Sequence, residues 1–252
     1  MALRRVIELL ARGRRLTRHM PARFGGRPLV VSPDAALRWL KPGEDAFEDN
    51  LLQLADHWVM PGDLVWDVGA NVGVFSVAAA HRSGKTVIAI EADPFLADLL
   101  RDTAEKPGNA ELALDVLCVA IGDHNGFDRF SIARRGRASN GLARGALSTQ
   151  HGGSRQAMTV PMITLDALLD QAGPPDLVKI DVEGGEAIVM AGATRLLTEA
   201  RPLIYIEVTD HTRDAVVRQL LAADYSLCDG DQGLADPIPM SQTTCNILAR
   251  PQ

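Results

Sequence analysis

Two acidic residues and a glycine-rich turn in this sequence have the types and spacing of a ligand-binding site. In residues 65–75, VWDVGANVGVF, an aspartate, two glycines and an asparagine directly follow apolar positions. A strand, a glycine-rich turn and a helix in that order place backbone N–H groups beside a ligand. The residues of this segment that we predict to bind a cofactor are Asp67, Gly69, Asn71, Gly73 and Phe75.

The second acid, Glu91, ends the apolar run of TVIAIEADP. An acid at that position can accept hydrogen bonds from both hydroxyls of a ribose. Asp67 would repel a phosphate group and attract a cation such as an ammonium group, and GxNxG differs from the GxGxxG of dinucleotide sites. A ribose, a positive charge and no phosphate describe S-adenosylmethionine, which is the predicted cofactor. An NAD-dependent oxidoreductase remains the alternative.

Acidic residues that could act on an acceptor follow two later apolar runs. Methyl transfer from this cofactor needs an in-line acceptor, and an acceptor that must lose a proton also needs a base within hydrogen-bond reach. Asp181, after the run 177–180, is predicted beside the methyl group, and Glu207 or His211 is a candidate base. Glu183 has two possible roles: it could belong to the site, or it could begin the next helix. The sequence offers no tight ligand spacing, so no metal ion is predicted.

The adenine ring is expected against the apolar residues 112–121. Backbone groups near Ala120 and the neighbouring apolar side chains could enclose the ring. Asp115 or Asp123 could accept a hydrogen bond from its amino group.

These residues must be positioned by short apolar runs that alternate with helical patterns from residue 60 onward. Such alternation predicts an α/β fold with a parallel sheet covered by helices on both faces. Two final strands joined by a Gly/Asp/Pro loop predict an antiparallel edge. The predicted strands are residues 64–68, 86–90, one within 112–121, 177–180, 203–208, 225–228 and 245–249, and the predicted helices are 73–81, 94–105, 186–197 and 212–223.

Two further segments surround this core. Residues 1–60 are predicted to be an N-terminal basic helix and a cap segment, with a short helix at 35–40, and residues 61–252 form the main domain. The first helix is amphipathic, with apolar residues at 3, 6, 7, 9 and 10. Residues 134–157 are rich in Gly, Ser and Arg and are predicted to be a long loop. That loop is either a flexible connector or a lid whose arginines meet an acidic acceptor.

Charge and cysteine content exclude several functions. The 252 residues carry a net charge of −6, with +7 on residues 1–27 and −13 on the remainder. An acidic body argues against nucleic acid as partner, while the basic N-terminus could touch a membrane surface. No apolar run reaches the roughly 18 residues of a membrane helix, and no secretory signal is recognised. Three scattered cysteines imply neither a disulfide framework nor a zinc site, so a cytoplasmic protein is expected. A homo-oligomer is also possible.

Several motifs together resemble the FkbM family of S-adenosylmethionine-dependent methyltransferases. They are DVGANVGVFS, IEADP, VPMITLDALL, DLVKIDVEGGEAIVMAGATRLL and RPLIYIEV, in this order between about residues 65 and 208. The family resemblance implies a class I methyltransferase, Rossmann-like fold, with a seven-stranded sheet whose last strand is antiparallel. It also implies O-methylation of a hydroxyl group on a small molecule, a sugar or glycan, or a secondary metabolite. The second glycine of EGGE departs from the family pattern. A non-catalytic nucleoside-binding module on the same fold remains open.

Overall fold

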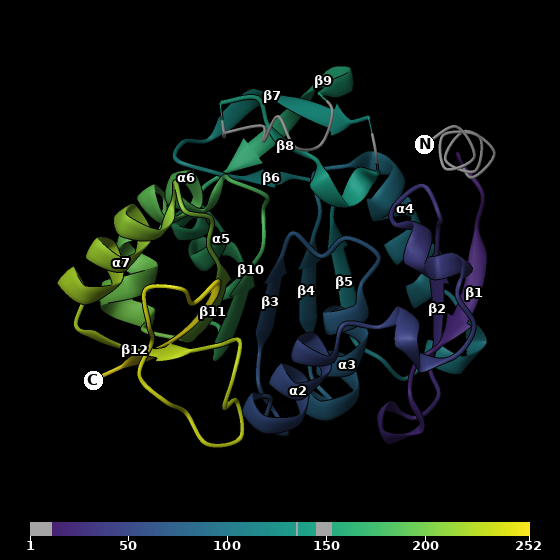
Figure 1. The fold of residues 1–252 in the computed structure, drawn as a ribbon, viewed down its shortest axis with the longest axis horizontal. Coiled ribbons are helices and arrows are strands. Elements are labelled where there is room, and N and C mark those ends of the chain that lie inside the picture. The colour runs from purple at the N-terminus through teal and green to yellow at the C-terminus, as the bar shows by residue number, and fades with distance from the viewer. Residues whose placement is uncertain (1–11, 135, 145–152) are drawn as a thin grey trace.

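The computed structural model describes residues 12–134, 136–144 and 153–252. Its centre is a seven-stranded sheet with the strand order β12-β13-β11-β10-β3-β4-β5 (Figure 1). Within the described residues, β13 alone runs antiparallel to its neighbours in this sheet. The predicted class I methyltransferase architecture is therefore confirmed. The strands are β3 (Val65–Val68), β4 (Val87–Ile90), β5 (Leu114–Leu117), β10 (Leu177–Ile180), β11 (Leu203–Glu207), β12 (Tyr225–Asp229) and β13 (Asn246–Pro251).

Helices cover both faces of the sheet and enclose two hydrophobic cores. Val65 packs into one core, while its neighbour Trp66 packs into the other, as the alternation of side chains along a strand requires. A strand buried on both faces is apolar at nearly every position, so a charged residue within it must find a partner inside the protein. The first core is covered by α2 (Asp49–Trp58), α3 (Val74–Ser83) and α4 (Pro94–Ala104), the second by α5 (Leu165–Ala172), α6 (Glu186–Ala191) and α7 (Arg213–Ala222).

A second, four-stranded sheet that the sequence analysis did not predict lies above the first in Figure 1. Its longest strands pair antiparallel, and Phe130 and Ile132 of β7 supply its small core. Part of the predicted loop at 134–157 belongs to this sheet, whereas residues 135 and 145–152 of that loop lie outside the described residues. The strands, in spatial order, are β6 (Ala120–Ile121), β9 (Ser154–Ile163), β7 (Gly126–Ala133) and β8 (Gly141–Leu142).

The N-terminal segment differs from the predicted helical cap. Its described part holds an antiparallel pair, β1 (Leu16–His19) and β2 (Pro28–Val31), before α2. The short helix predicted at 35–40 is a 3-10 helix over Leu37–Leu40. The amphipathic helix predicted within residues 1–11 lies outside the described residues. In the ranges that the structure does describe, no helix is both long and apolar enough to cross a membrane.

The helix predicted over residues 186–197 is interrupted. The helix α6 ends at Ala191, and a π-helical turn follows over Leu196–Ala200. A Cβ atom on Gly192 would lie 2.1 Å from the carbonyl oxygen of Gly122. The glycine is therefore needed for the close approach of this segment to the end of β6, which ties the second sheet to the first.

Candidate active site

Four residues named by the sequence analysis form one row at the carboxyl edge of the sheet. The last residues of β3, β4 and β10 are in register with one another, so Gly69, Glu91 and Asp181, which follow them, lie side by side. Glu207, at the end of β11, continues the row because the residue before it pairs with the last residue of β10. Open α/β sheets bind ligands at this edge.

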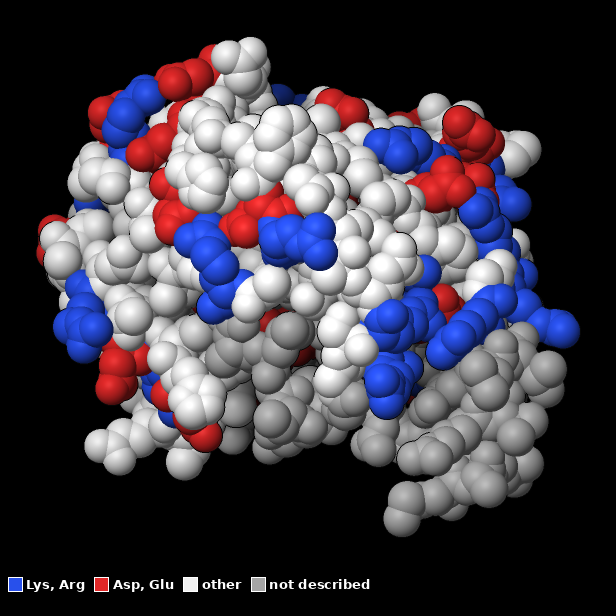
Figure 2. Space-filling model, turned by 90° about the horizontal axis from the view of Figure 1, so that it is seen from above, with Lys and Arg blue, Asp and Glu red and all other residues white. Residues whose placement is uncertain are grey.

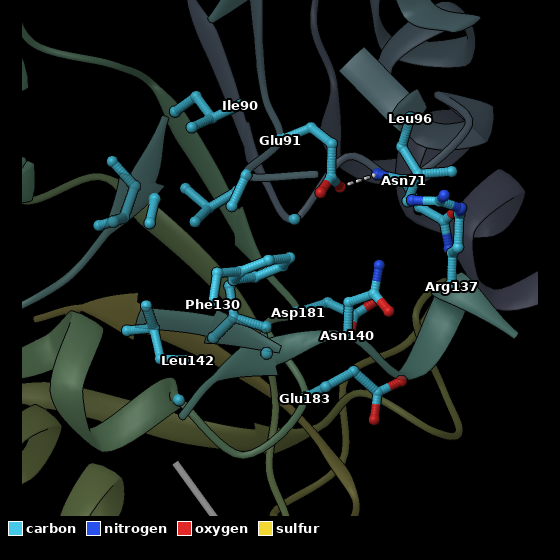
Figure 3. Close-up of a pocket in the computed structure, with 18 of the residues that line it drawn as sticks. Asn71, Ile90, Glu91, Leu96, Phe130, Arg137, Asn140, Leu142, Asp181 and Glu183 are labelled. Atoms are coloured by element: carbon cyan, nitrogen blue, oxygen red, sulfur yellow. Dashed lines mark hydrogen bonds between the residues drawn. The ribbon is translucent and has the colours of Figure 1, made fainter. Parts of the chain in front are cut away.

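A cavity of about 620 Å³, counting its open mouth, begins at this row. The predicted residues Gly69, Asn71, Glu91, Ala120 and Asp181 all line it. Figure 3 shows Glu91 and Glu183 on opposite sides of the cavity, with the ring of Phe130 between the two walls. Its apolar part is formed by Val68, Ile90, Leu96, Val119, Ala120, Ile121, Phe130 and Leu142, and its polar part includes Asn71, Glu91, Arg137, Asn140, Asp181 and Glu183.

Glu91 is fixed in this cavity by two backbone N–H groups. Asn71 donates to Oε2 and Asp93 donates to Oε1, each at 2.8 Å (Figure 3 shows the first). Burial raises the pKa of Glu91 to about 7, although the hydrogen bond from Asp93 opposes the shift. On the same wall, Oδ1 of Asn71 is buried and accepts no hydrogen bond from the described residues. The wall therefore presents a carboxylate and an amide oxygen to donor groups of a ligand.

Gly69 is required by the close approach of two strand ends. Its φ is +77°, and a Cβ atom there would lie 1.8 Å from the carbonyl oxygen of Asp181. Gly73 precedes α3, where a Cβ atom would lie 2.5 Å from a methyl carbon of Leu100. Phe75 is buried and borders a neighbouring cavity rather than the first one. These residues thus shape the turn and its helix.

Asp67 was expected to face the positive charge of a ligand, but it lies within β3 and is fully buried. The strand register places Lys179 of β10 beside it, with Nζ at 3.3 Å from both Asp67 Oδ1 and Asp181 Oδ2. Ser76 donates a hydrogen bond to Oδ2 of Asp67. Nζ of Lys179 also donates to the carbonyl oxygen of Gly69 at 2.9 Å. The cation that Asp67 binds is therefore internal, and the pair links the glycine turn to Asp181.

The charge of Lys179 is secured by this arrangement. Burial alone would lower the pKa of its ammonium group, but Asp67 and Asp181 outweigh that effect and hold the pKa above its ordinary value. Because Lys179 remains charged, Asp181 keeps a cation at its back while its side chain, 27% exposed, borders the cavity.

A second cavity adjoins the first and shares Asn71, Asp181 and Glu183 with it. Glu183 has a left-handed backbone, with φ of +51°, and neither an ion pair nor a side-chain hydrogen bond is found for it in the described chain. The residue as a whole is exposed. Loss of hydration of its carboxyl group against the cleft wall, followed by the negative charge of Asp181, raises the pKa of Glu183 to about 8. Glu207 lines the second cavity and a third one beside it, but not the first. Loss of hydration against the cleft walls raises the pKa of Glu207 above its ordinary value, and the negative charges of Asp181 and Glu183 add to this effect.

Three other predicted residues lie away from the cavities just described. His211 is exposed in the turn before α7. The N–H of Val208 donates to the carbonyl oxygen of Cys245, and after Val208 the chain leaves the sheet edge. Asp115 is exposed on β5, and Asp123 pairs with Arg144. The acids expected to meet an adenine amino group are thus absent from this apolar wall.

Arginines of the segment 134–157 pair with acids of the protein itself. Arg137 binds both Asp34 and Asp93, and Arg155 donates to Asp34 through two nitrogens at 2.9 and 3.0 Å. Asn140 donates to Asp93 at 2.6 Å. Arg144 binds Asp123 and Asp128. These three arginines therefore tie the described parts of the segment, residues 136–144 and 153–157, to the rest of the protein. They are engaged with acids of the protein and not left free for an acidic acceptor.

Comparison with protein families decides what this arrangement belongs to. A family model described as "Methyltransferase FkbM domain" matches residues 67–227, from the buried aspartate to β12. The chain belongs to the FkbM methyltransferase family. Because its domain is that of a family of S-adenosylmethionine-dependent methyltransferases, the NAD-dependent alternative is set aside.

The curated relatives that this chain matches are matched over about half of their length or less. A hexuronic acid methyltransferase, AglP, of Haloferax volcanii is 28% identical over 153 residues, which are 60% of this chain and 58% of that protein. A ribosomal protein L11 methyltransferase of Pelotomaculum thermopropionicum is 39% identical over 82 residues, 32% of this chain and 26% of that protein. The solved structure of an FkbM methyltransferase of Methylobacillus flagellatus KT has a TM-score of 0.48 at 15% identity, covering 75% of this chain and 43% of that chain.

The residues of the first cavity fit S-adenosylmethionine. The apolar wall around Phe130 and Leu142 suits a flat base, and Glu91 can accept from two ribose hydroxyls. The unpartnered Oδ1 of Asn71 is an acceptor for the donor groups of the ligand. Gly69 allows the backbone to approach closely. The cofactor would therefore lie along the row that leads to Asp181.

A test of this fit uses Glu91. We expect Glu91→Gln to weaken binding of S-adenosylhomocysteine by about tenfold or more, because an amide cannot accept from two backbone N–H groups and two hydroxyls at once. In the unmodified protein, ligand donors favour the ionised form, so affinity should rise with pH and level off above about 7. Calorimetry from pH 5.5 to 8.5 measures both effects.

The matched control for that test is Asp115→Asn, which changes an exposed acid outside the cavity and should leave the affinity within about twofold. Equal affinities for Glu91→Gln and the unmodified protein would contradict the assigned role of Glu91.

Proposed function

We propose that this enzyme transfers the methyl group to a hydroxyl of a sugar or a similar polyhydroxylated small molecule. The main support is the second cavity, which opens directly beside the first and is lined by Asp181, Glu183 and Glu207. An alcohol becomes a good nucleophile only when a base removes its proton, and carboxylates at the junction of two cavities are suited to that work. A similar protein named as a hexuronic acid methyltransferase adds support for a sugar acceptor.

Among the three acids, Glu183 meets all the requirements of a general base. It borders both cavities, its carboxylate is not engaged with a cation of the described chain, and its pKa of about 8 lies near working pH. Asp181 borders the same junction but is paired with Lys179. Glu207 does not border the first cavity. We therefore assign the role of general base to Glu183. Asp181 and Glu207, which the sequence analysis predicted to be catalytic, orient the acceptor instead.

The bound cofactor supplies an electrophilic methyl group on a sulfonium. The residues of the protein then have three tasks. Glu183 takes the proton of the acceptor hydroxyl at a carboxylate oxygen. Asp181, held by Lys179, accepts a hydrogen bond that turns the hydroxyl oxygen toward the first cavity. Phe130 and Leu142 close the cavity against water, which would otherwise compete with the acceptor.

The proposed function is tested by supplying S-adenosylmethionine with a set of sugars, glycosides and non-sugar alcohols. The expected result is a product heavier by about 14 Da, one methylene by stoichiometry, with the methyl group on oxygen as shown by NMR. A parallel set of amines and a protein fraction is tested under the same conditions. Methylation restricted to nitrogen would contradict the proposal.

A further inference from the structure

The second and third cavities form one acceptor pocket whose lining is strongly acidic. The pocket is continuous because both cavities are lined by Glu48, Lys179, Asp181 and Glu207. Asp49 and Glu183 add further carboxylates at its two ends. A pocket with this many acids attracts a cation and repels an anion, and selection by repulsion is a common source of specificity.

The basic residues of the pocket do not balance these acids. Lys179 lies between Asp67 and Asp181, so its single charge faces two carboxylates. Arg38 is paired with Glu48, and Arg23, which lies outside the lining, is 3.6 Å from Asp49. Glu183 and Glu207 form no ion pair in the described chain, so two acids of the lining stay without a cation. The described lining therefore keeps an excess of negative charge after these pairs are formed.

A buried atom at the back of the pocket supports the same conclusion. Asp67 is fully buried and borders the second cavity, and its Oδ1 accepts no hydrogen bond from the described residues. The nearest cation, Nζ of Lys179, lies 3.3 Å away and also serves Asp181 and Gly69. Lys179 thus faces two carboxylates with one positive charge, and Oδ1 of Asp67 is left as an acceptor without a hydrogen bond at the back of the pocket.

Figure 2 shows that the outer surface seen from above carries mixed charge, with acidic and basic side chains side by side. The acidic excess is therefore a property of the pocket and not of that whole face. Its position beside the first cavity makes it relevant to the acceptor.

We propose that the acceptor carries a protonated amine and no carboxylate or phosphate, as an amino sugar or an aminocyclitol does. The inference rests on the proposed function, since it describes the molecule whose hydroxyl is methylated. The ammonium group lies beside Glu207, which lines both cavities and forms no ion pair in the described chain, while a hydroxyl of the same molecule reaches Glu183. The positive charge favours the ionised form of Glu207. An anionic sugar such as the one named for the Haloferax relative places its carboxylate against these acids and is rejected.

The test compares four methyl glycosides that differ in charge: glucosamine, N-acetylglucosamine, glucose and glucuronic acid. Binding is measured by ligand-observed NMR with S-adenosylhomocysteine present, at pH 7.5 and low salt. We expect the glucosamine glycoside to bind at least about tenfold more tightly than the glucuronic acid glycoside, with the two neutral sugars between them. The difference should shrink in 0.5 M salt, because exposed charges are screened.

Two variants of one ion pair sharpen the test. Glu48→Gln removes an acid and leaves Arg38 without its partner, so it should reduce the preference for the amine several-fold. Arg38→Gln removes a cation and should increase that preference. The affinity for S-adenosylhomocysteine, measured in parallel, shows whether each variant is folded. Opposite changes in the two variants are a result that general loss of structure does not produce.

Equal or tighter binding of the glucuronic acid glycoside overturns the inference, and so does a failure of all four sugars to bind. Failure of the proposed function has a different signature. If the amine-bearing sugar binds most tightly but its methyl product is found on nitrogen, the acceptor class stands and O-methylation is rejected.

Discussion

Replacement of Glu183 by glutamine is expected to lower kcat by about 10²–10⁴-fold, the usual contribution of a general base. Glutamine keeps the size of the side chain and its polar oxygen, but it cannot take a proton from the acceptor. Glu183 lies at the junction of the two cavities, whereas Glu91, the residue that we expect to bind the ribose, lies on the opposite wall. The affinity for S-adenosylhomocysteine should therefore change by no more than a few-fold.

The pH dependence of the unmodified enzyme provides a second measurement of Glu183. The base must be ionised, so kcat/KM should rise with pH and level off above about 8. The same shift affects stability: a carboxyl whose pKa is raised by folding stabilises the folded protein below about 4.5, the ordinary value, and this stabilisation is lost as the pH rises toward 8. Glu183→Gln should thus be relatively more stable than the unmodified protein at pH 9.

The matched control is Glu207→Gln. Glu207 lines the second and third cavities but not the first, and its negative charge and that of Glu183 act on each other. Its replacement should raise KM, lower kcat by less than about tenfold and move the rise of kcat/KM to lower pH. If Glu207→Gln instead abolishes turnover while Glu183→Gln retains it, the roles of the two acids are reversed.

The sequence was sufficient to locate the ligand-binding edge of the sheet. Parallel strands end at a common edge, so polar residues that follow successive apolar runs must come together. This reasoning correctly placed Gly69, Asn71, Glu91 and Asp181 in one cavity. It could also predict the antiparallel β13, because two short final strands have to add to an existing edge.

The opposite wall of the cavity could not be predicted in the same way. Phe130 and Leu142 lie in a second sheet whose pairing depends on contacts between residues far apart in the sequence. The alternation of GFDRFSIA indicates a strand but does not say which cavity it covers. Likewise, Asp34 and Arg137 are 103 residues apart, and their ion pair appears only when the N-terminal segment lies against the second sheet.

Asp67 shows how strand register changes the interpretation of a charged residue. A carboxylate just before a glycine turn favours a ligand cation on local grounds. However, in the parallel pair of β3 and β10, residues in register lie on the same face, which brings Lys179 to Asp67. The lysine therefore has a role that its position in KIDVEG does not reveal by itself: it pairs with a buried acid and orients a half-buried one.

This role leads to the last prediction. Lys179→Met should lower the free energy of unfolding by about 3–5 kcal/mol, because it leaves the fully buried Asp67 without its cation. Methionine fills a similar volume, so packing contributes little to the loss. The double variant Asp67→Asn with Lys179→Met removes both charges and should recover more than half of that stability. Chemical denaturation measures all three proteins.

Asp181→Asn is the matched single change for this cycle. Asp181 is 27% exposed, so water can solvate the groups that remain, and the loss should stay below about 1 kcal/mol. A cost for Lys179→Met no greater than that of Asp181→Asn, or no recovery in the double variant, would show that Lys179 does not stabilise the glycine turn through Asp67. The buried pair would then have to act on catalysis alone, through the orientation of Asp181.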